Sequence, residues 1–598
     1  MDFILFLLIF LAFNNSGQIL TSKLKFSGPG EAFLFSTALG SILISAIITA
    51  LAFSGGISST VCWVILGVFL LVGWKNLLHL KQVLNIFSSQ QPMEDDGLKN
   101  MAQSFLGLLV FLSIGLALAP AFATDALVYH LAVPKAFLQA GELVNLPNNI
   151  YSFFPQQIEM LYLFALALGS DSLAQLTGLG VAFLLLFALW QYSRKKVGKS
   201  YAWLTPLIFI STPTFFSVAS SAYVDLQAAA YVFLAFYSWE NGCTRKQPAW
   251  FFLMTLFAGA AVATQLTTII ILPLAFLGLA IHGRSHKKTS QTAGQCFLLI
   301  LGSLLMLSPW LARNYFFTGN PLFFIDSLSF PINLTIFSEL HSFPFNGQIG
   351  ILYLLLLPAL LGLRRESHPV VIVFLVLLVF WFVQTQTISL LAPAFAFLSV
   401  LMVSGLKQLF QQNGTGKSEK FFLTTVLALG LFFNTSLIMK EWFRIEPLSY
   451  LLNKENREQF LTRQIRAYPA YQDANKILTE KDRVMLIDMK NLGYLMNQPF
   501  YNDAFAQTLT EVIDKGVYAA DIANRLQTRG INHALFNFNY VFGKNSALTI
   551  GERAIFKNFL NLHGEQLSSK NGFLLYRFML DSKTGNQNKN SGFNFEGH

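Results

Sequence analysis

Fourteen apolar runs constrain this chain more than any other feature of its sequence. A transmembrane helix needs about 20 mostly apolar residues. The composition agrees, because 54% of the 598 residues are hydrophobic, only 12% are charged and 60 are phenylalanine, which is unlike soluble globular domains. The sequence therefore predicts an α-helical polytopic membrane protein with about fourteen spans, at 3–20, 31–53, 57–74, 103–122, 170–192, 200–216, 222–239, 249–264, 267–281, 295–312, 346–363, 369–384, 388–406 and 421–439.

The basic residues fall in alternate connections between these runs. One set of connections before the C-terminal region holds nineteen lysines and arginines, and the opposite set holds two, Lys135 and Arg313. Basic loops remain in the cytoplasm, so we expect a multi-pass protein of the inner (plasma) membrane with both termini outside. The formal net charge of +10 comes largely from these loops. We therefore expect a membrane rather than a nucleic acid as the partner of this charge.

Two stretches need a separate interpretation for this topology to hold. The apolar segment 155–168 is short, and we interpret it as a re-entrant or interfacial helix whose ends are buried in protein. The apolar stretch 249–281 is read as two helices joined at 264–267. The outer face then gathers several loops, of which 123–154 and 313–345 are the largest.

The composition also predicts the domain organisation. Residues 1–100 hold N-terminal transmembrane helices, and 101–439 form the transmembrane domain that carries the large outer loops. From 440 to 582 the chain is charged and mixed, and β-like runs at 484–488, 533–537 and 573–577 alternate with helical stretches such as 519–527 and 552–562. We expect a small extracytoplasmic α/β domain there, followed by a disordered tail at 583–598. Three cysteines lack the spacing of a metal site or a disulfide framework.

The stretch Asp125-Ala-Leu-Val-Tyr-His-Leu-Ala-Val-Pro-Lys135 follows an apolar run and carries four polar side chains. As a helix it would place Tyr129 one turn beyond Asp125, with His130 beside it. Asp125 either caps this helix or acts as a general base that takes a proton from an attacking hydroxyl. His130 and Lys135 are either interfacial residues or ligands of an anionic substrate.

Two further sites lie on the same predicted face. Asp225, in Tyr223-Val-Asp225, either caps the next span or serves as a second carboxylate that orients the acceptor or holds a divalent cation. Arg313 and Asn314 begin the stretch that ends in Gly-Asn-Pro321. They are either an interfacial anchor and turn or a binding site for phosphate, to which a guanidinium is suited.

Four motifs, in this order, resemble bacterial GT-C integral membrane glycosyltransferases of the family 39-like group, which also resembles protein O-mannosyltransferases and aminoarabinose transferases. They are the Asp125–Lys135 stretch, Phe154-Pro-Gln-Gln-Ile-Glu-Met-Leu-Tyr162 with Leu168-Gly-Ser-Asp171, Tyr223-Val-Asp225, and Pro309-Trp-Leu-Ala-Arg-Asn-Tyr-Phe-Phe-Thr-Gly-Asn-Pro321. The resemblance covers residues 100 to 410, and the α/β tail with Tyr576-Arg577 near its end also resembles the outer domain of the group. It implies sugar transfer from a polyprenyl-phosphate carrier to an acceptor on the outer face. An acid in the first large outer loop of these enzymes matches Asp125, and a second matches Asp225.

The chain departs from this group at two positions. Many relatives carry a lysine where this chain has Gln265 and an arginine where it has Ser389. Both cations would lie near an anionic donor, so their absence shifts the expected phosphate-binding role toward Arg313, Lys135 and His130.

The resemblance favours an inverting glycosyltransferase that moves a sugar from a polyprenyl-phosphate donor to a hydroxyl of a lipid, glycan or protein acceptor. Asp125 is the expected base, and the donor is expected to contact Tyr129, His130, Lys135, Arg313 and Asn314. No cofactor is required, although a divalent metal ion at Asp225 stays open. Two alternatives remain: a lipid or glycan transporter or flippase, whose charges should lie at mid-membrane depth, and a catalytically degenerate scaffold protein of the same fold.

Overall fold

A computed structural model describes most of the chain as two compact units. The first comprises Met1–Ala126, Val133–Leu146 and Ile150–Arg457, and the second comprises Leu127–Ala132, Pro147–Asn149 and Glu458–His598. The described residues are 1–73, 96–147, 149–245, 247–285, 289–326, 348–384, 387–411, 417–498, 500–502, 512–513, 518–544, 546 and 548–580. The predicted tail at 583–598 and most of the predicted loop 313–345 lie outside them.

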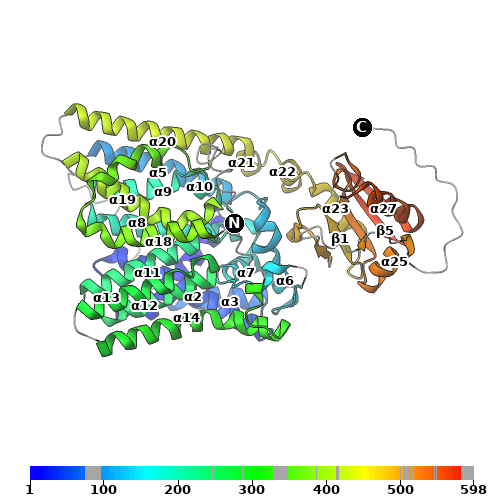
Figure 1. Ribbon diagram of the computed structural model, residues 1–598, viewed down its shortest axis with the longest axis horizontal. Helices are drawn as coiled ribbons and strands as arrows, with labels where there is room; N and C mark the ends of the chain where they lie inside the picture. The colour runs from blue at the N-terminus through cyan, green and yellow to red at the C-terminus, as the bar shows by residue number, and fades with distance from the viewer. Residues whose placement is uncertain are drawn as a thin grey trace. The chain divides into compact units, whose positions relative to one another are not determined.

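The first unit is a bundle of apolar helices that run side by side (Figure 1). Within the described residues, nine helices are long and apolar enough to cross a membrane, which confirms the prediction of a polytopic α-helical membrane protein. They are α1 (Asp2–Thr21), α2 (Pro29–Phe53), α5 (Asp96–Ala117), α8 (Asp171–Lys196), α13 (Ile271–Ser285) with η5 (Leu266–Thr268), α14 (Thr289–Thr318), α18 (His368–Val383), α19 (Ala392–Gln411) with η8 (Ile388–Leu391), and α20 (Lys417–Ile445).

The other predicted spans also fall on helices. Most residues of α11 (Asp225–Arg245) are buried, so this helix lies inside the bundle. The shorter helices are α3 (Ser59–Val72), α12 (Pro248–Thr264), and α17 (Leu352–Leu356) with η6 (Leu357–Gly362). The predicted break near 264–267 is present, because α12 ends at Thr264 and η5 separates it from α13.

The predicted span at 200–216 is a broken helix. After η4 (Tyr201–Trp203), helices α9 (Leu204–Ile210) and α10 (Pro213–Ala219) follow, and the chain bends by 80° between them. Pro213 has no N–H to donate, and a proline disfavours helical backbone at the residue before it. Thr212 accordingly has an extended backbone, with ψ 117°. Helix α10 then leads into the short connection before Asp225, the first residue of α11.

The segment predicted to be re-entrant or interfacial contains a short buried helix. Helix α7 (Glu159–Leu168) has 10 residues, which at about 1.5 Å per residue cannot span a bilayer core of about 30 Å. Almost all of its side chains are buried. Together with α6 (Ala132–Ala140), it lies at one end of the bundle (Figure 1).

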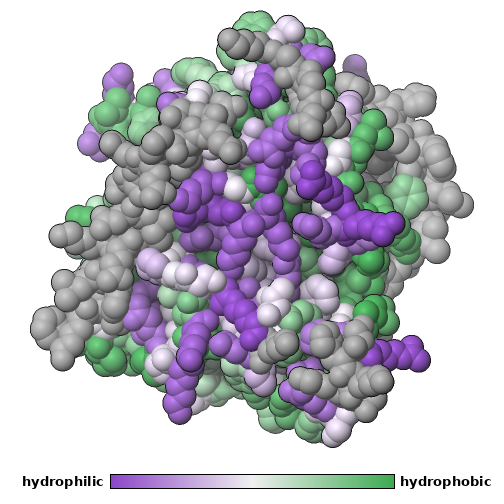
Figure 2. Space-filling model, turned by 90° about the vertical axis from the view of Figure 1, so that its left-hand side faces the viewer, coloured by the Kyte–Doolittle hydropathy of each residue, from purple (hydrophilic) through white to green (hydrophobic). Residues whose placement is uncertain are grey.

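The opposite end of the bundle gathers charged residues, and hydrophilic side chains cover the centre of this face (Figure 2). Glu31 at the start of α2 is 3% exposed and pairs with Lys195 from α8 and Arg245 from α11. Lys196 pairs with Glu240 nearby. Because these lysines and arginines belong to the predicted cytoplasmic set, their meeting at one end agrees with the alternation seen in the sequence.

The second unit contains a five-stranded mixed sheet. Its strands lie in the order β2-β1-β3-β5-β4, and β1 is parallel to both of its neighbours, whereas β5 is antiparallel to β3 and β4. The sequence predicted β1, β3 and β5 and missed the other two. The strands are β1 (Val484–Ile487), β2 (Phe500–Asn502), β3 (His533–Asn537), β4 (Gly564–Lys570) and β5 (Phe573–Phe578).

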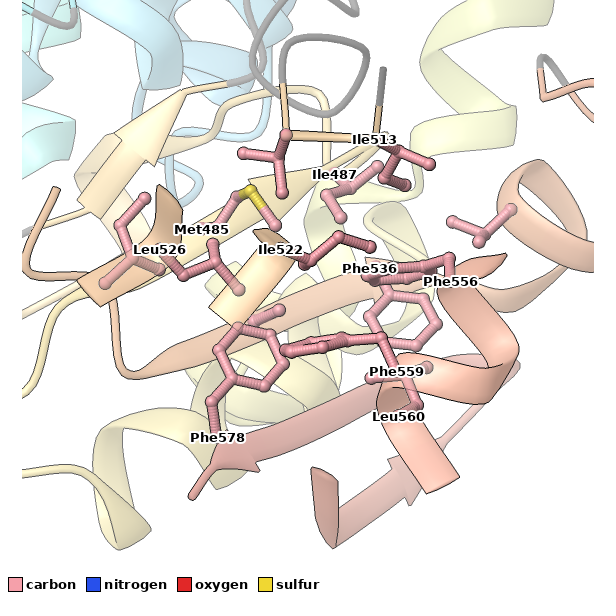
Figure 3. Packing of buried hydrophobic residues seen from close by; sticks show 14 of the residues in the cluster. Met485, Ile487, Ile513, Ile522, Leu526, Phe536, Phe556, Phe559, Leu560 and Phe578 are labelled. Carbon is pink, nitrogen blue, oxygen red and sulfur yellow. The ribbon is translucent and has the colours of Figure 1, made fainter. Parts of the chain in front are cut away.

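An apolar core joins this sheet to its helices (Figure 3). Met485 and Phe536 of the sheet pack with Ile522 of α25 (Ala519–Thr528) and with Phe556 of α27 (Ile550–His563). The predicted α/β fold of this region is thereby confirmed. The remaining helices of this part of the chain are α21 (Pro447–Leu451), α22 (Arg457–Gln464), α23 (Tyr468–Ile477) and α26 (Phe538–Phe542), with the 3-10 turn η9 (Gly493–Leu495).

Candidate active site

Asp125 lies beyond the end of α5 and is exposed. The helical turn at Asp125 continues as a π-helix, η2 (Ala126–His130), rather than as the α-helix that the sequence predicts. Single π-helical turns are frequent at functional sites. Tyr129 thus follows Asp125 through a π-helical turn, where the sequence predicts an α-helical one.

Tyr129 and His130 belong to the second compact unit, whereas Asp125 and Lys135 belong to the first. Tyr129 is partly buried, and His130 is 4% exposed. Their rings contact each other, with centroids 4.0 Å apart. The motif read from the sequence as one polar cluster is therefore divided between two units.

Tyr223 links the two acids of the site. Its pKa is raised to about 12, first by burial and next by the negative charge of Asp125, with a further contribution from Asp225. The phenol oxygen also has a hydrogen bond with the backbone of Asp125, and the carbonyl oxygen of Tyr223 accepts a hydrogen bond from the Tyr162 hydroxyl. Tyr151 is also influenced by this acid. Burial and, next, the negative charge of Asp125 raise the pKa of its phenol.

Asp225 is the first residue of α11 and is 7% exposed. Its Oδ1 accepts one hydrogen bond from Gln265 Nε2 at 2.9 Å and another from Ser389 Oγ at 3.1 Å. Gln265 and Ser389 are the two positions where the sequence departs from the GT-C group, and the fold brings both to the same carboxylate oxygen. Among the residues that the structure describes, no lysine or arginine forms an ion pair with Asp225.

The surroundings of Asp225 suit a hydrogen-bonded carboxylate better than a metal ligand. Within the described parts of the chain, no three His, Cys, Asp or Glu side chains converge on a position that could hold a metal ion. The Gln265 side chain directs its N–H group toward the carboxylate, and an amide nitrogen of this kind is not a metal donor. The described residues around Asp225 therefore do not fit a divalent metal ion.

Arg313 lies near the end of α14 and is 1% exposed. Its Nη1 donates to Gln156 Oε1 at 3.1 Å, and its Nη2 donates to the carbonyl oxygen of Phe154 at 3.1 Å. The next residue, Asn314, donates from Nδ2 to the carbonyl oxygen of Phe153 at 2.9 Å. Arg313 and Asn314, predicted to bind phosphate, thus hold residues 153–156 against α14.

The 153–156 segment is also held on its other sides. Phe153 packs against Phe323, with ring centroids 4.7 Å apart. The N–H of Gln157 donates to the carbonyl oxygen of Ala263 at 3.1 Å, and the carbonyl oxygen of Gln157 accepts from Ser45 Oγ. Segment 153–157 therefore connects α14, α12 and α2 just before α7 begins.

Lys135 on α6 is partly buried and lies in the electrostatic field of Arg457. Burial and, as a smaller cause, the positive charge of Arg457 together lower the pKa of its ammonium to about 8. Arg457 itself binds both carboxylate oxygens of Asp171, at 2.8 and 2.7 Å. Asp171 is 1% exposed and also accepts from the N–H of Ala121 at 2.9 Å.

Sequence reasoning missed three residues with structural roles at this site. In the sequence Tyr223 stands out only as part of the Tyr-Val-Asp motif, although it lies by both acids. Gln156 binds the buried arginine. Arg457 belongs to none of the motifs that carry the family resemblance. The only signal in the sequence was Asp171, an acid at the start of a transmembrane helix, which needs a basic partner such as Arg457.

Solved structures share this fold. The crystal structure of ArnT from Cupriavidus metallidurans bound to undecaprenyl phosphate matches with a TM-score of 0.52 and 12% identity, over 81% of this chain and 98% of that one. Its apo state matches with a TM-score of 0.52 and 14% identity, over 79% and 96%. The apo oligosaccharyltransferase of Archaeoglobus fulgidus has a TM-score of 0.45 and 12% identity, over 79% and 74%.

The similarity to ArnT confirms the GT-C fold that the sequence motifs suggested. At these identities it shows the fold alone. No protein of curated function matches the sequence. The model of the family described as "Domain of unknown function (DUF8201)" matches residues 1–436, which is more than half of the chain, and the chain therefore belongs to this family.

Proposed function

We propose that this protein is an inverting glycosyltransferase that moves a sugar from a polyprenyl-phosphate donor to an acceptor hydroxyl on the extracytoplasmic face of the membrane. The observation that carries the proposal is the grouping of Asp125 and Asp225 around Tyr223 at one end of the bundle. The GT-C fold supports it by analogy. The acceptor is a lipid, glycan or protein.

In the proposed reaction the acceptor oxygen attacks the anomeric carbon of the donor sugar. The new bond from this carbon to the acceptor oxygen forms as its bond to the phosphate oxygen breaks. Asp125 takes the acceptor proton as general base, and the polyprenyl phosphate leaves with the electron pair of the broken bond. One displacement at the anomeric carbon inverts its configuration.

Asp225 would orient the acceptor and stabilise positive charge on the sugar. Sugar transfer passes through a transition state with positive charge near the anomeric carbon. The hydrogen bonds from Gln265 and Ser389 fix the position of the Asp225 carboxylate without an opposite charge beside it. A fixed carboxylate of this kind needs no reorganisation when the charge develops.

Lys135 is the best candidate to hold the donor phosphate. Its ammonium is partly buried and lies near Arg457. Because Arg457 is paired with the carboxylate of Asp171, the net positive charge available to stabilise an anion there is that of Lys135. Arg313 has a different role in this proposal, because its guanidinium is buried and bonded to protein acceptors. We assign it, with Asn314, to positioning the 153–156 segment. Tyr129 and His130 remain proposed donor contacts.

An apolar groove between α13 and α14 would receive the prenyl chain. It begins near the η5 turn that follows Gln265, and it continues along the two helices toward their other ends. A lipid-linked donor could thus keep its tail in the membrane while its phosphate reaches the site. The groove is lined by Leu272, Pro273, Phe276, Leu299, Ile300, Ser303, Leu304 and Leu307.

The position of the charges argues against the transporter alternative. A transport path should place charges at mid-membrane depth. Asp125 and Asp225 instead stand at helix starts, at the end of the bundle that holds α6 and α7. The degenerate-scaffold alternative is separated from our proposal by the following experiment.

Asp125→Asn tests the proposed reaction directly. Mass spectrometry of cell-envelope glycans and glycoproteins, with and without the gene, identifies the product. Cells complemented with Asp125→Asn should then make less product than cells complemented with the wild-type gene, by a factor of about 10² or more, because a general base contributes at least that much to the rate. The matched control is Glu142→Gln, which changes an exposed acid of the same loop and should restore wild-type product. Full product with Asp125→Asn would refute the mechanism, and an unchanged glycan profile without the gene would favour the scaffold.

A further inference from the structure

In the C-terminal sheet, the strands that follow β1 in the chain lie on opposite sides of it. This feature has no part in the proposed reaction. Strand β1 lies between β2 and β3 and is parallel to both. The chain passes from β1 to β2 on one side, and it then passes to β3 on the other side. In open α/β sheets, ligands bind in the crevice beyond the carboxyl ends of the strands at such a switch point.

Polar side chains occupy the carboxyl ends of these two strands. Asp488 directly follows β1, and Asn537 is the last residue of β3. Asn537 Nδ2 donates to Asp488 Oδ2 at 2.7 Å, so the two side chains bridge the strand ends. Asp488 is exposed and Asn537 is partly exposed, which leaves both accessible to a ligand.

The loop after β1 has an unusual backbone. Asp488, Lys490 and Asn491 have φ values of 49°, 55° and 54°, in the left-handed region that residues other than glycine rarely adopt. The buried hydroxyl of Tyr471 holds the loop, because it donates to the carbonyl oxygen of Met489 at 2.8 Å and accepts from the N–H of Leu492 at 3.2 Å. Strained backbone that its surroundings hold in place is concentrated at ligand-binding and active sites.

The chemistry of the crevice selects the class of ligand. A carboxylate accepts hydrogen bonds, amides both donate and accept, and a lysine donates, which together suit the many hydroxyl groups of a sugar. Asp488 and Lys490 have opposite charges, so the loop after β1 is close to neutral. A phosphate would meet the negative charge of Asp488 at the strand end, which disfavours an anionic ligand.

We propose that the carboxyl ends of β1 and β3, at Asp488 and Asn537, form with the loop residues Lys490 and Asn491 a crevice that binds a neutral, hydroxyl-rich carbohydrate. Its identification as the acceptor of the sugar rests on the proposed transfer reaction. The crevice thus gives the second unit a substrate-recognition function separate from the carboxylates of the helical bundle.

The test uses the full chain in lipid nanodiscs and fluorescently end-labelled neutral oligosaccharides of glucose, mannose, galactose and N-acetylglucosamine. At least one series should bind saturably. Asp488→Gly removes the side chain and keeps the left-handed backbone accessible, and it should weaken binding on the order of tenfold, as loss of a charge-assisted hydrogen bond does. Asn537→Ala should weaken it as well, whereas the control Asn524→Ala, at an exposed position on α25, should not.

The proposal fails if no oligosaccharide binds, if both crevice variants bind as the wild type does, or if inorganic phosphate displaces the probe. Asp125→Asn separates this proposal from the transfer reaction. This variant should lose sugar transfer and keep oligosaccharide binding. If Asp125→Asn transfers sugar normally and Asp488→Gly binds the oligosaccharide more weakly, the mechanism at Asp125 is refuted and the proposed carbohydrate site is supported.

Discussion

Arg313→Ala distinguishes a residue that positions the site from one that binds the donor. The guanidinium is 1% exposed, and two of its nitrogens donate to Gln156 and to the backbone of Phe154. The sequence predicted that this arginine binds phosphate, in which case its loss should raise the donor KM. The structure instead predicts that its loss releases the 153–156 segment.

The magnitude follows from these two contacts. A hydrogen bond to a charged group contributes about 1.5–3 kcal/mol, so the contacts to Gln156 and Phe154 amount to about 3–6 kcal/mol as an upper limit, because neighbouring contacts are not additive. Arg313→Ala should therefore lower the melting temperature of the detergent-solubilised protein and reduce kcat. The donor KM should stay close to the wild-type value, because no phosphate contact is lost.

The controls are Asn314→Ala and Arg313→Lys. Asn314 donates one hydrogen bond to Phe153 and accepts from Nε and Nη2 of Arg313. Its variant removes these contacts but keeps the bonds from Arg313 to Gln156 and Phe154, so it should show the same changes at smaller size. Lysine presents a point charge rather than a planar fork, and Arg313→Lys should recover part of the stability. A donor KM raised at least tenfold in Arg313→Ala, at an unchanged melting temperature, would refute our reasoning and restore the phosphate-binding role.

Three other predictions follow from the same structure. The donor KM should rise as the pH increases through about 8, where the ammonium of Lys135 loses its proton. Lys135→Arg should abolish this dependence because arginine stays charged. A pH profile of Lys135→Arg that matches the wild type would contradict the phosphate role of Lys135. Gln265→Lys should lower the donor KM and also lower kcat, and a rise in both would contradict the electrostatic role of Asp225. Cysteines placed at Asn320 and Asn537 should react with an impermeant thiol reagent in intact cells, whereas one at Ser418 should not, and labelling at Ser418 alone would reverse the topology.

Local signals predicted the membrane fold because each one belongs to a single segment. An apolar run identifies its own helix, and the separation of α12 from α13 followed from the positions of basic residues in later loops. The bend between α9 and α10 was also encoded locally, by Pro213 after an extended Thr212. It was missed because the apolar character of the run continues across the proline. Strands β2 and β4 lack a clear alternating pattern, and β4 is mostly exposed.

The candidate site was predicted only in part because its contacts join residues far apart in sequence. Family resemblance identified Asp225, Gln265 and Ser389 separately, and only the fold shows that they meet at one oxygen atom. Arg313 illustrates the opposite case. A lone basic residue near a predicted outer loop suggested an anion ligand, but a buried guanidinium needs acceptors, and the backbone of a distant segment supplies them.

The neutral residues around Asp225 change what this acid can do. At 4 Å, a lysine at position 265 would interact with the carboxylate by about 4 kcal/mol at an effective dielectric constant near 20, whereas the neutral hydrogen bond from Gln265 contributes about 1 kcal/mol. A cation would thus attract the donor phosphate but cancel most of the negative potential at the sugar. With Gln265 and Ser389, Asp225 keeps that potential for the positive charge of the transition state. The phosphate must in this proposal be held elsewhere, and we assign that role to Lys135 of the 123–154 loop, whose ammonium is partly buried.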